Sequence, residues 1–542
     1  MGFMNELKNE SLNNQLGLTE NGAVVYTSCG NKLTDFNFHV STYRDQDADT
    51  IINDFEEAYL ENKELAVRYL FFLGDIREGL GERHVFRELM KELAKREPDL
   101  ARAVISYIPE YGRWDEVVDL LDTPLRKDAV SMLKKQLDED VENMKNGNSV
   151  SLCAKWMPSI NATKAEVRKH ALILCNELNM EKKDYRHMLS NLRDKLNIIE
   201  KALAEKNVEK LDAMQESLTS KQNYKYKKAL MNLMPEQRME YFNKVLAGEA
   251  NYNADVLEPH EIYYRYRNDM EDRKVVSVDM GYEIMWRELP NKVKKDNQVL
   301  VMRDGSGSML SNIPGTNNGT ILDVSSALTV YFAEHTDGEF KDKFITFSSH
   351  PEIVDLSSCD NLYEKIKKLN HYDDYTNTNL EAAFDMILNT AVNNHLAQED
   401  LPKNLLVISD MEFDYATDSG WGKYNFTKWT PTLFDTIRDK YEAAGYKIPR
   451  LIFWNVNNRS QTIPEIRNEL GIVLIGGYSK NNIDMICEGN FEKEVITESG
   501  KKEVVQLKPE EILANQIMSE RYDPIGNAIR PILEAQNKKY KK

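Results

Sequence analysis

The sequence predicts a multidomain protein in which an all-α, HEAT-like helical-repeat region precedes an α/β domain with a doubly wound parallel sheet. Two observations lead to this prediction. From about residue 47 to residue 286 the apolar residues recur at helical spacing, with few β-branched runs. After residue 298, short apolar runs alternate with helical segments, which is typical of a buried parallel sheet covered by helices. At 542 residues the chain is also too long for one ordinary core.

We expect three segments: an N-terminal arm over residues 1–46, a helical-repeat domain over 47–290, and an α/β domain over 291–542 that ends in a helix and a basic tail. Helices are predicted over residues 165–179, 185–205 and 235–247, among others. Amphipathic helices joined by short breaks are typical of stacked helix pairs, but no fixed repeat length is visible. In the α/β domain, strands are predicted over 299–302, 343–347, 405–409, 451–456 and 472–475, with helices over 321–334, 380–388 and 431–444.

The composition excludes several classes of protein. No apolar run is long enough to span a membrane, the first residues lack a signal-peptide pattern, and the five cysteines show neither metal-ligand nor disulfide spacing. We therefore expect a cytoplasmic protein with no membrane partner. The net charge of −18 argues against nonspecific coating of nucleic acid. Residues 151–250, however, carry 18 Lys and Arg against 13 Asp and Glu, so selective binding of nucleic acid there is possible.

A hydroxyl-rich turn follows the first predicted strand of the α/β domain. Asp304, Ser306 and Ser308 alternate with glycines that let the backbone turn tightly. Asp410 follows another strand, as Asp304 does, so both carboxylates are expected at one edge of the sheet. Carboxylate and hydroxyl oxygens suit a hard cation, so the sequence predicts one bound ion, Mg²⁺ or Mn²⁺.

The sequence from Asp304 to Ser308 resembles the metal-ion-dependent adhesion site of von Willebrand factor A domains. The resemblance implies Asp410 as the last carboxylate ligand and a metal-binding threonine before the helix at 380–388. Thr378 fits the family spacing better, and Thr376 is the alternative. In that family one coordination position is left for an acidic group of a partner, which implies binding rather than catalysis.

The whole chain resembles the Ro autoantigen, or TROVE-domain, family, and in particular a branch of plant, bacterial and phage proteins. The motifs that carry the resemblance are residues 69–83, Tyr111-Gly112-Arg113-Trp114-Asp115, and residues 154–159, 185–190 and 409–414. The resemblance implies a ring of helical repeats closed by the metal-binding domain. It also implies a non-catalytic ribonucleoprotein subunit that binds small noncoding RNA on a basic face. We expect such a protein to be a monomer.

Basic residues cluster in three stretches of the segment 151–250. Two of them fall on predicted helices, and the third interleaves cations with Tyr224 and Tyr226, whose rings can stack on unpaired bases. The candidate RNA-binding residues are Lys164, Arg168, Lys169, His170, Lys183, Arg186, His187, Arg193, Lys221, Lys225, Lys227 and Lys228. The alternative is that these residues form solvated helix faces. His170 and His187 have no ligand-spaced partner, so we expect polar surface or buried hydrogen-bonded roles for them.

Two other functions remain open: a protein-binding module whose partner supplies an acidic residue to the metal, and a metal-dependent nuclease or phosphatase. The carboxylates available for the second are Asp304, Asp373, Asp374, Asp410, Glu412 and Asp414. The hydroxyl-rich turn suits one ion, and no residue stands out as a general base. We expect Asp373, Asp374, Glu412 and Asp414 to be acidic loop surface. Phosphate-binding loops and zinc-protease helices are absent from the sequence, so we expect no enzyme.

Overall fold

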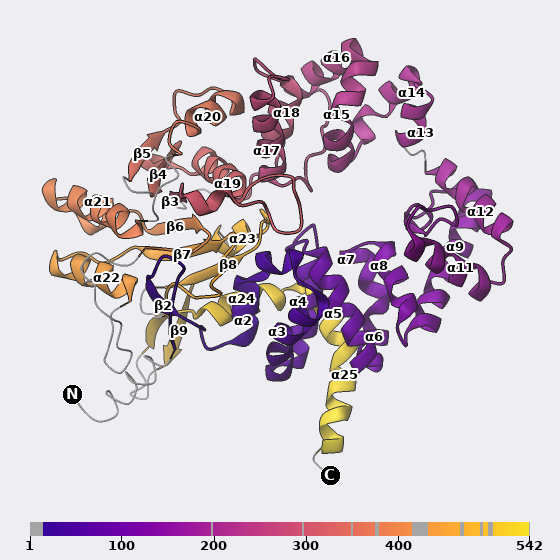
Figure 1. Cartoon of the computed structure of the whole chain (residues 1–542), viewed down its shortest axis with the longest axis horizontal. Helices are drawn as coiled ribbons and strands as arrows, with labels where there is room; N and C mark the ends of the chain where they lie inside the picture. Colours follow the sequence, from indigo (N-terminus) through magenta and orange to yellow (C-terminus); the bar gives the residue numbers. More distant parts are fainter. Residues whose placement is uncertain are drawn as a thin grey trace. The chain divides into compact units, whose positions relative to one another are not determined.

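The computed structural model describes residues 15–196, 199–294, 298–347, 351–373, 379–414, 432–466, 471–487, 491–496 and 502–540. It confirms the predicted fold class, because a helical region precedes an α/β domain whose six-stranded sheet is mostly parallel (Figure 1). The chain forms two compact units. The helical unit contains residues 48–256 and 517–542, and the α/β unit contains residues 1–47 and 257–516.

The helical unit consists of short amphipathic helices. In α5, for example, Val85, Leu89 and Leu93 recur every four residues and are buried. Side-chain caps and prolines in the first turn begin several of the helices; Asn62, for example, accepts a hydrogen bond from Leu65 N. The helices in chain order are α3 (Ala48–Glu61), α4 (Lys63–Gly74), α5 (Arg83–Arg96), α6 (Pro98–Val104), α7 (Ile108–Tyr111), α8 (Trp114–Asp119), α9 (Arg126–Lys145), α10 (Cys153–Trp156), α11 (Ala165–Glu177), α12 (Lys182–Lys195), α13 (Ile199–Ala204), α14 (Val208–Ala213), α15 (Ser220–Leu233) and α16 (Pro235–Leu246).

The single helix predicted over residues 185–205 is wrong, because the structure has two helices there. α12 ends at Lys195 and α13 begins at Ile199. Leu192 and Ile199 are both buried and lie seven residues apart, which keeps the apolar residues in helical phase across the break. The spacing alone therefore hides the interruption.

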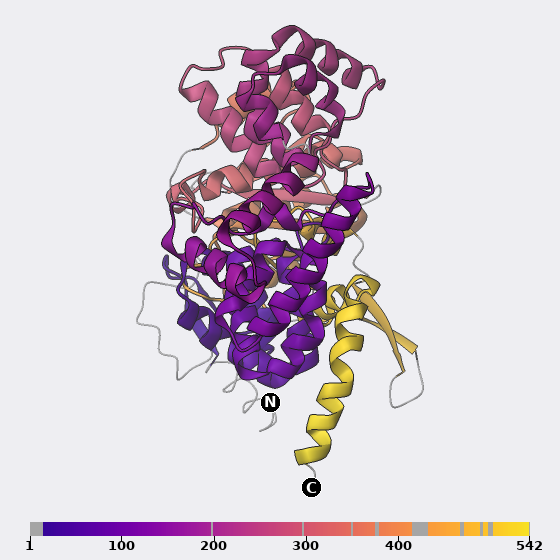
Figure 2. The ribbon, with the colours of Figure 1, turned by 90° about the vertical axis from the view of Figure 1, so that its right-hand side faces the viewer.

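The last helix of the chain, α25 (Asp523–Tyr540), belongs to the helical unit. It packs against α4 and α6, more than 400 residues earlier in the sequence (Figures 1 and 2). Arg68 of α4 is fully buried and donates to Tyr522 O over 3.2 Å and to Asp523 Oδ1 over 3.1 Å. A Cβ at Gly526 would lie 1.9 Å from Arg68 Nη2, so the helix approaches this guanidinium closely.

The large sheet of the α/β unit has the strand order β5-β4-β3-β6-β7-β8, and every pair except β4–β5 is parallel. The predicted strands are confirmed. β5 was not predicted, because only Val354 of its four residues is buried. The strands are β3 (Val299–Asp304), β4 (Lys343–Phe347), β5 (Glu352–Asp355), β6 (Asn404–Ser409), β7 (Arg450–Asn455) and β8 (Val473–Gly476).

Helices cover both faces of this sheet. Leu300 and Met302 of β3 belong to a core that includes residues of α21 (Leu380–Asn393) and α22 (Leu433–Ala443). Arg303, which points to the opposite face, contacts Ser326 of α19 (Ile321–His335). The other α-helices described between residues 257 and 517 are α17 (Pro259–Glu271), α18 (Met280–Arg287), α20 (Leu362–Leu369), α23 (Asn482–Cys487) and α24 (Pro509–Ile517). A separate hairpin pairs β9 (Glu492–Ile496) with β10 (Lys502–Gln506).

The segment from residue 15 to residue 47 packs within the α/β unit. It forms a hairpin of β1 (Leu16–Leu18) and β2 (Val24–Tyr26), then helix α2 (Lys32–Phe38). Val25 and Tyr26 are buried in the core shared with α21 and α22. Asn455 at the end of β7 donates to Phe38 O over 2.7 Å. The turn between β1 and β2 also contacts the loop that follows Asp410, because Thr19 Oγ1 donates to Phe413 O over 2.6 Å.

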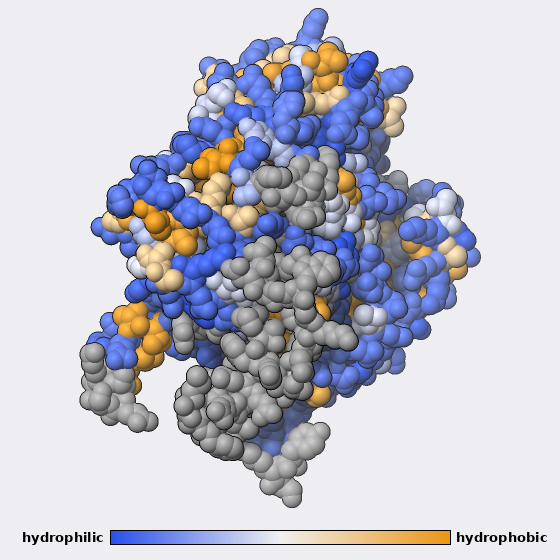
Figure 3. Space-filling view, turned by 60° about the vertical axis from the view of Figure 1, so that its left-hand side comes forward, coloured by the Kyte–Doolittle hydropathy of each residue, from blue (hydrophilic) through white to orange (hydrophobic). Residues whose placement is uncertain are grey.

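The molecular surface shown in Figure 3 is mainly hydrophilic, with apolar residues in small groups. This agrees with the 29% of charged residues in the chain. In the parts of the chain that the structure describes, no helix is both long and apolar enough to cross a membrane.

Candidate functional site

The structure brings Asp304, Ser306, Ser308 and Asp410 together at one edge of the sheet. β3 ends at Asp304, its parallel neighbour β6 ends at Ser409, and Asp410 comes next. Ser409 Oγ donates to Asp304 Oδ2 over 2.5 Å, which ties the two strand ends together. Thr378 and Thr376 lie outside the described residues.

The turn after β3 holds the two serines close to each other. Ser306 N donates to Asp304 Oδ1 over 2.9 Å, so the carboxylate of Asp304 begins the turn. The hydroxyl oxygens of Ser306 and Ser308 are 3.0 Å apart, a distance typical of neighbouring ligands of a small cation as well as of a hydrogen bond. Ser306 is buried and Ser308 is half-buried. The arrangement presents neutral oxygens next to two buried carboxylates.

Asp410 carries a buried oxygen without a hydrogen-bond partner. Its Oδ2 is paired with no donor in the described part of the chain, and Arg459 Nη2 lies 3.6 Å from it. Burial, and after it the neighbouring charge of Asp304, raises the pKa of Asp410 to about 7, although the hydroxyl of Ser308 and the charge of Arg459 act in the opposite direction. Burial also raises the pKa of Asp304. A buried, unpaired carboxylate oxygen beside hydroxyl ligands fits a site for a hard divalent cation.

Backbone geometry beside Asp410 is also unusual. Met411 has a φ of 62°, which a non-glycine residue rarely adopts. Its N–H donates to Ser409 Oγ over 2.9 Å, and its side chain is buried. Ser409 therefore holds both Asp304 and the turn that carries Asp410.

A buried ion pair lies next to the predicted ligands and was not expected from the sequence. Arg303 is fully buried, pairs with Asp373 and donates to Ser326 Oγ over 3.0 and 2.8 Å. Asp373 is therefore buried in an ion pair rather than on the loop surface. Asp374 lies outside the described residues. The sequence could have indicated this ion pair, because Arg303 is a charged residue within an apolar strand and a buried charge needs a partner.

The prediction that Glu412 is acidic surface is wrong, because Glu412 is fully buried. Its carboxylate accepts hydrogen bonds from the backbone N–H groups of Glu20, Arg459 and Ser460, at 2.8, 2.9 and 2.8 Å, and from Ser460 Oγ at 2.6 Å. These four bonds use the ordinary accepting capacity of a carboxylate. Glu412 thus has a structural role: it fixes the loops that contain Glu20 and Arg459. Asp414, by contrast, is half-buried.

The candidate RNA-binding residues around α11 are engaged within the protein. Arg168 Nη1 donates to Ala162 O and Thr163 O, both over 2.6 Å. Lys169 Nζ and His170 Nε2 both contact Asp122, at 2.7 and 2.8 Å. His170 is buried, whereas Lys164 is exposed.

On α12 the candidate residues share one surface hollow. The hollow measures 660 Å³. Its lining contains four of the candidates, one carboxylate, three further residues of α12 and a loop: Lys183, Arg186, His187 and Arg193, then Asp194, then Tyr185, Leu189 and Ser190, and residues 159–161. Lys183, Arg186 and His187 are exposed. Arg193 instead donates to Ala154 O and Met157 O, at 2.9 and 2.8 Å, and so stabilises the preceding segment.

The candidates on α15 lie outside that hollow. Lys221, Lys225 and Lys228 are exposed and Lys227 is half-buried. Lys225 Nζ lies 4.7 Å from the centre of the Tyr226 ring and 3.9 Å from Glu200 Oε1. Tyr226 donates to Glu200 over 2.6 Å, so its ring is held on the protein surface.

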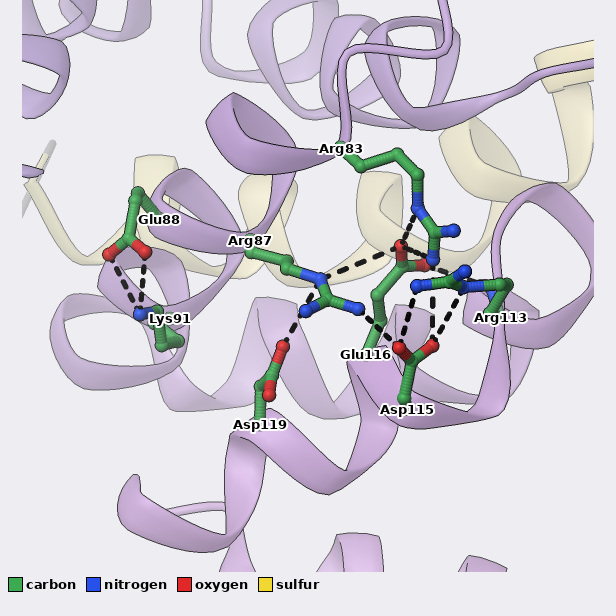
Figure 4. Close-up of polar contacts among 8 residues, drawn as sticks. All are labelled: Arg83, Arg87, Glu88, Lys91, Arg113, Asp115, Glu116 and Asp119. Atoms are coloured by element: carbon green, nitrogen blue, oxygen red, sulfur yellow. Dashed lines mark hydrogen bonds and ion pairs between the residues drawn. The ribbon is translucent and has the colours of Figure 1, made fainter. Parts of the chain in front are cut away.

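Two sequence motifs of the helical unit, residues 69–83 and 111–115, contribute to an ion-pair network between α5 and α8 (Figure 4). Three arginines face three carboxylates; Arg83 Nε donates to Glu116 over 2.8 Å, and Asp115 accepts from Arg87 and Arg113 over 2.6 and 2.7 Å. The third carboxylate, that of Asp119, lies 3.3 Å from Arg87 Nε.

Glu116 is the buried centre of this network. Its side chain is 2% exposed and accepts from Arg113 N over 2.9 Å, which caps α8. A Cβ at Gly112 would lie 1.9 Å from Glu116 Oε2, so a larger residue there would displace this carboxylate. The network joins α5 to α8, and its three arginines are neutralised by its three carboxylates.

Comparison with known proteins identifies relatives of both parts of the chain. The model of a family described as a domain of unknown function, DUF7788, matches residues 298–526. This match includes the four clustered metal-ligand candidates and Arg459. The chain is also 26% identical over 506 residues to an uncharacterised protein, L728, of Acanthamoeba polyphaga mimivirus, covering 86% of this chain and 83% of that protein. The α/β domain is thus similar to the DUF7788 family, and most of the chain is similar to the mimivirus protein.

Proposed function

We propose that this protein is a non-catalytic RNA-binding protein, similar to the Ro family, whose α/β domain holds one Mg²⁺ or Mn²⁺ ion. The metal would be bound by Asp304, Ser306, Ser308 and Asp410, as in von Willebrand factor A domains, with Thr378 as the further predicted ligand. The observation that carries the metal site is the buried Oδ2 of Asp410, which has no hydrogen-bond partner among the described residues. A divalent ion there would offset the cost of two buried carboxylates.

Metal binding is tested by titrating the chelator-treated protein with Mn²⁺, following the free ion by electron paramagnetic resonance and the heat by calorimetry. We expect one ion per chain in the wild type, and loss of binding in Asp304→Asn and Asp410→Asn. Asp385→Asn, which changes a carboxylate on the surface of α21, is the matched control and should bind normally. Binding that survives both Asp304→Asn and Asp410→Asn would contradict the proposed site.

RNA binding is supported by the hollow on α12. Two exposed cations, Lys183 and Arg186, line a concave surface large enough for nucleotides. They outnumber the one carboxylate of the lining, that of Asp194. Cationic grooves of this kind follow the phosphate backbone of single-stranded nucleic acid. The overall charge of −18 makes such a local site selective, because the rest of the surface repels phosphate.

Ultraviolet crosslinking in the native cell, followed by sequencing of the recovered RNA, tests this proposal. Charge reversal by Lys183→Glu and Arg186→Glu should reduce the recovered RNA at least about tenfold, since two phosphate contacts become repulsive. The matched double variant on α15, Lys225→Glu with Lys228→Glu, should retain most of it. The opposite pattern would move the binding surface to α15, and no RNA above background from the wild type would refute RNA binding.

A second candidate is a protein-binding module in which an acidic side chain of a partner completes the metal shell. The hydroxyls of Ser306 and Ser308 favour this candidate, because neutral ligands leave the ion with positive charge for an anionic group. Asp304→Asn discriminates between the two candidates. It should abolish binding of such a partner, but it should leave RNA binding through α12 largely intact.

A further inference from the structure

The side chains of Glu20 and Arg459 form an ion pair directly beside Asp410. Arg459 Nη2 donates to Glu20 Oε2 over 2.7 Å and lies 3.6 Å from Asp410 Oδ2. The second distance is too long for a hydrogen bond, and Asp410 Oδ2 has no donor among the described residues. Arg459 thus faces two carboxylates and gives its hydrogen bond to the more exposed one.

Glu412 holds the two residues of this pair in place. Its carboxylate accepts from the backbone N–H groups of both Glu20 and Arg459, at 2.8 and 2.9 Å. Around it, Thr19 Oγ1 donates to Phe413 O over 2.6 Å and Asn21 Nδ2 donates to Glu412 O over 2.6 Å. The hairpin between β1 and β2 is therefore fixed against the loop that follows Asp410. The backbone positions do not depend on the side chains of Glu20 and Arg459.

We propose that the Glu20–Arg459 pair sets the affinity of the metal site, with Arg459 weakening cation binding and Glu20 limiting that effect. The inference rests on the proposed metal site. A guanidinium beside Asp410 repels a divalent cation bound to that carboxylate. Glu20 opposes this repulsion in two ways. Its negative charge compensates the guanidinium, and its oxygen accepts the Arg459 N–H group that could otherwise donate to Asp410.

Three variants test this division of roles by Mn²⁺ titration of the full-length protein. In Arg459→Gln the dissociation constant should fall at least about fivefold, because a nearby positive charge is removed. In Glu20→Gln it should rise, because Arg459 becomes free to bond Asp410 Oδ2. The double variant should bind like Arg459→Gln, since Glu20 acts only through Arg459.

Arg450→Gln is the matched control. It removes the same charge from a residue that begins β7, whereas Arg459 follows the end of that strand. Its metal affinity should equal that of the wild type. The side chains of Glu20 and Arg459 are 51% and 33% exposed, so neither substitution opens the core, and thermal melting in chelator verifies folding. In 1 M KCl the difference between wild type and Arg459→Gln should shrink, because screening acts on a partly exposed charge.

An unchanged or weakened affinity in Arg459→Gln would overturn the proposal while leaving the metal site itself intact. An equal effect of Glu20→Gln with and without Arg459 would overturn it as well. If neither the wild type nor Arg459→Gln binds Mn²⁺ at millimolar concentration, the proposed metal site fails and this inference fails with it.

Discussion

Ser409 donates its hydroxyl proton to Asp304 across the neighbouring ends of β6 and β3, over 2.5 Å. The two residues are 105 positions apart in the sequence. The same hydroxyl oxygen accepts from Met411 N, beside Asp410. One serine that binds no metal in our proposal thereby holds the carboxylate of Asp304 and the backbone turn that carries Asp410.

Ser409→Ala should weaken metal binding about tenfold, as removal of an orienting hydrogen bond commonly does. Mn²⁺ titration measures the effect. Ser325→Ala is the matched control, because Ser325 is also buried but its hydroxyl donates to Ile408 O instead of a carboxylate. Equal affinity in the two variants would show that Ser409 does not orient the site.

Metal-induced stabilisation should increase with pH. Folding raises the pKa of Asp410 from 3.8 to about 7, because the carboxyl is buried. In chelator the associated stability is fully present below pH 4, and is lost as the pH rises through about 7. Mg²⁺ binds the ionised form, so the rise in melting temperature on adding Mg²⁺ should be larger at pH 8 than at pH 5.5.

Asp410→Asn is the control for this pH dependence. The variant keeps the shape of the side chain but cannot ionise. Between pH 5.5 and pH 8, its melting temperature in chelator should therefore fall less than that of the wild type. Mg²⁺ should not stabilise it at either pH. A wild-type response to Mg²⁺ that is the same at both pH values would contradict the prediction.

Breaking the Arg303–Asp373 pair should destabilise the protein strongly. Asp373→Asn leaves a fully buried guanidinium without its countercharge, which costs about 3–5 kcal/mol. The double variant Arg303→Met with Asp373→Leu removes both charges and should lose less stability than Asp373→Asn. Urea unfolding measures both, and a loss below about 1 kcal/mol in Asp373→Asn would contradict this account.

Salt should weaken RNA binding, and the effect should be larger the more phosphate groups the residues of α12 contact. Each contact contributes a slope of about −0.7 to the plot of log affinity against log salt for single-stranded nucleic acid. Lys183→Gln and Arg186→Gln should each reduce the magnitude of the slope by about that amount. Lys225→Gln, on α15, should leave the slope unchanged. Fluorescence anisotropy with an RNA recovered by crosslinking provides the measurement.

Gly112→Ala should destabilise the helical unit by more than about 2 kcal/mol, because its methyl group would overlap Glu116 Oε2. The displaced carboxylate would also lose its bonds to Arg83 and to the backbone of Arg113. Denaturant unfolding monitored by circular dichroism measures the loss. A change below about 0.5 kcal/mol would mean that the network in Figure 4 adapts without cost.

The sequence predicted the features that depend on local patterns. Buried apolar runs gave the parallel strands, and a hydroxyl-rich turn after one of them identified Asp304, Ser306 and Ser308 as neighbours. The position of Asp410 after another strand was enough to predict that it lies at the same edge. These inferences succeeded because parallel strands end together.

Contacts between distant segments could not be predicted in the same way. Arg303 and Asp373 are 70 residues apart, and neither neighbouring sequence indicates the other. Glu412 follows Asp410 like an ordinary loop residue, yet it is buried because Glu20, 392 residues earlier, donates to it. Such pairs follow from the tertiary arrangement, on which hydrophobic periodicity carries no information.

The packing of α25 on α4 and α6 has a consequence for biosynthesis. The ribosome produces α4 long before α25, so Arg68 must wait until 454 and 455 further residues are translated before it meets Tyr522 and Asp523. Until then a guanidinium that is fully buried in the finished protein lacks these two acceptors. The helical unit thus reaches its final packing late, and nascent chains of this protein should depend on protection by chaperones until α25 emerges.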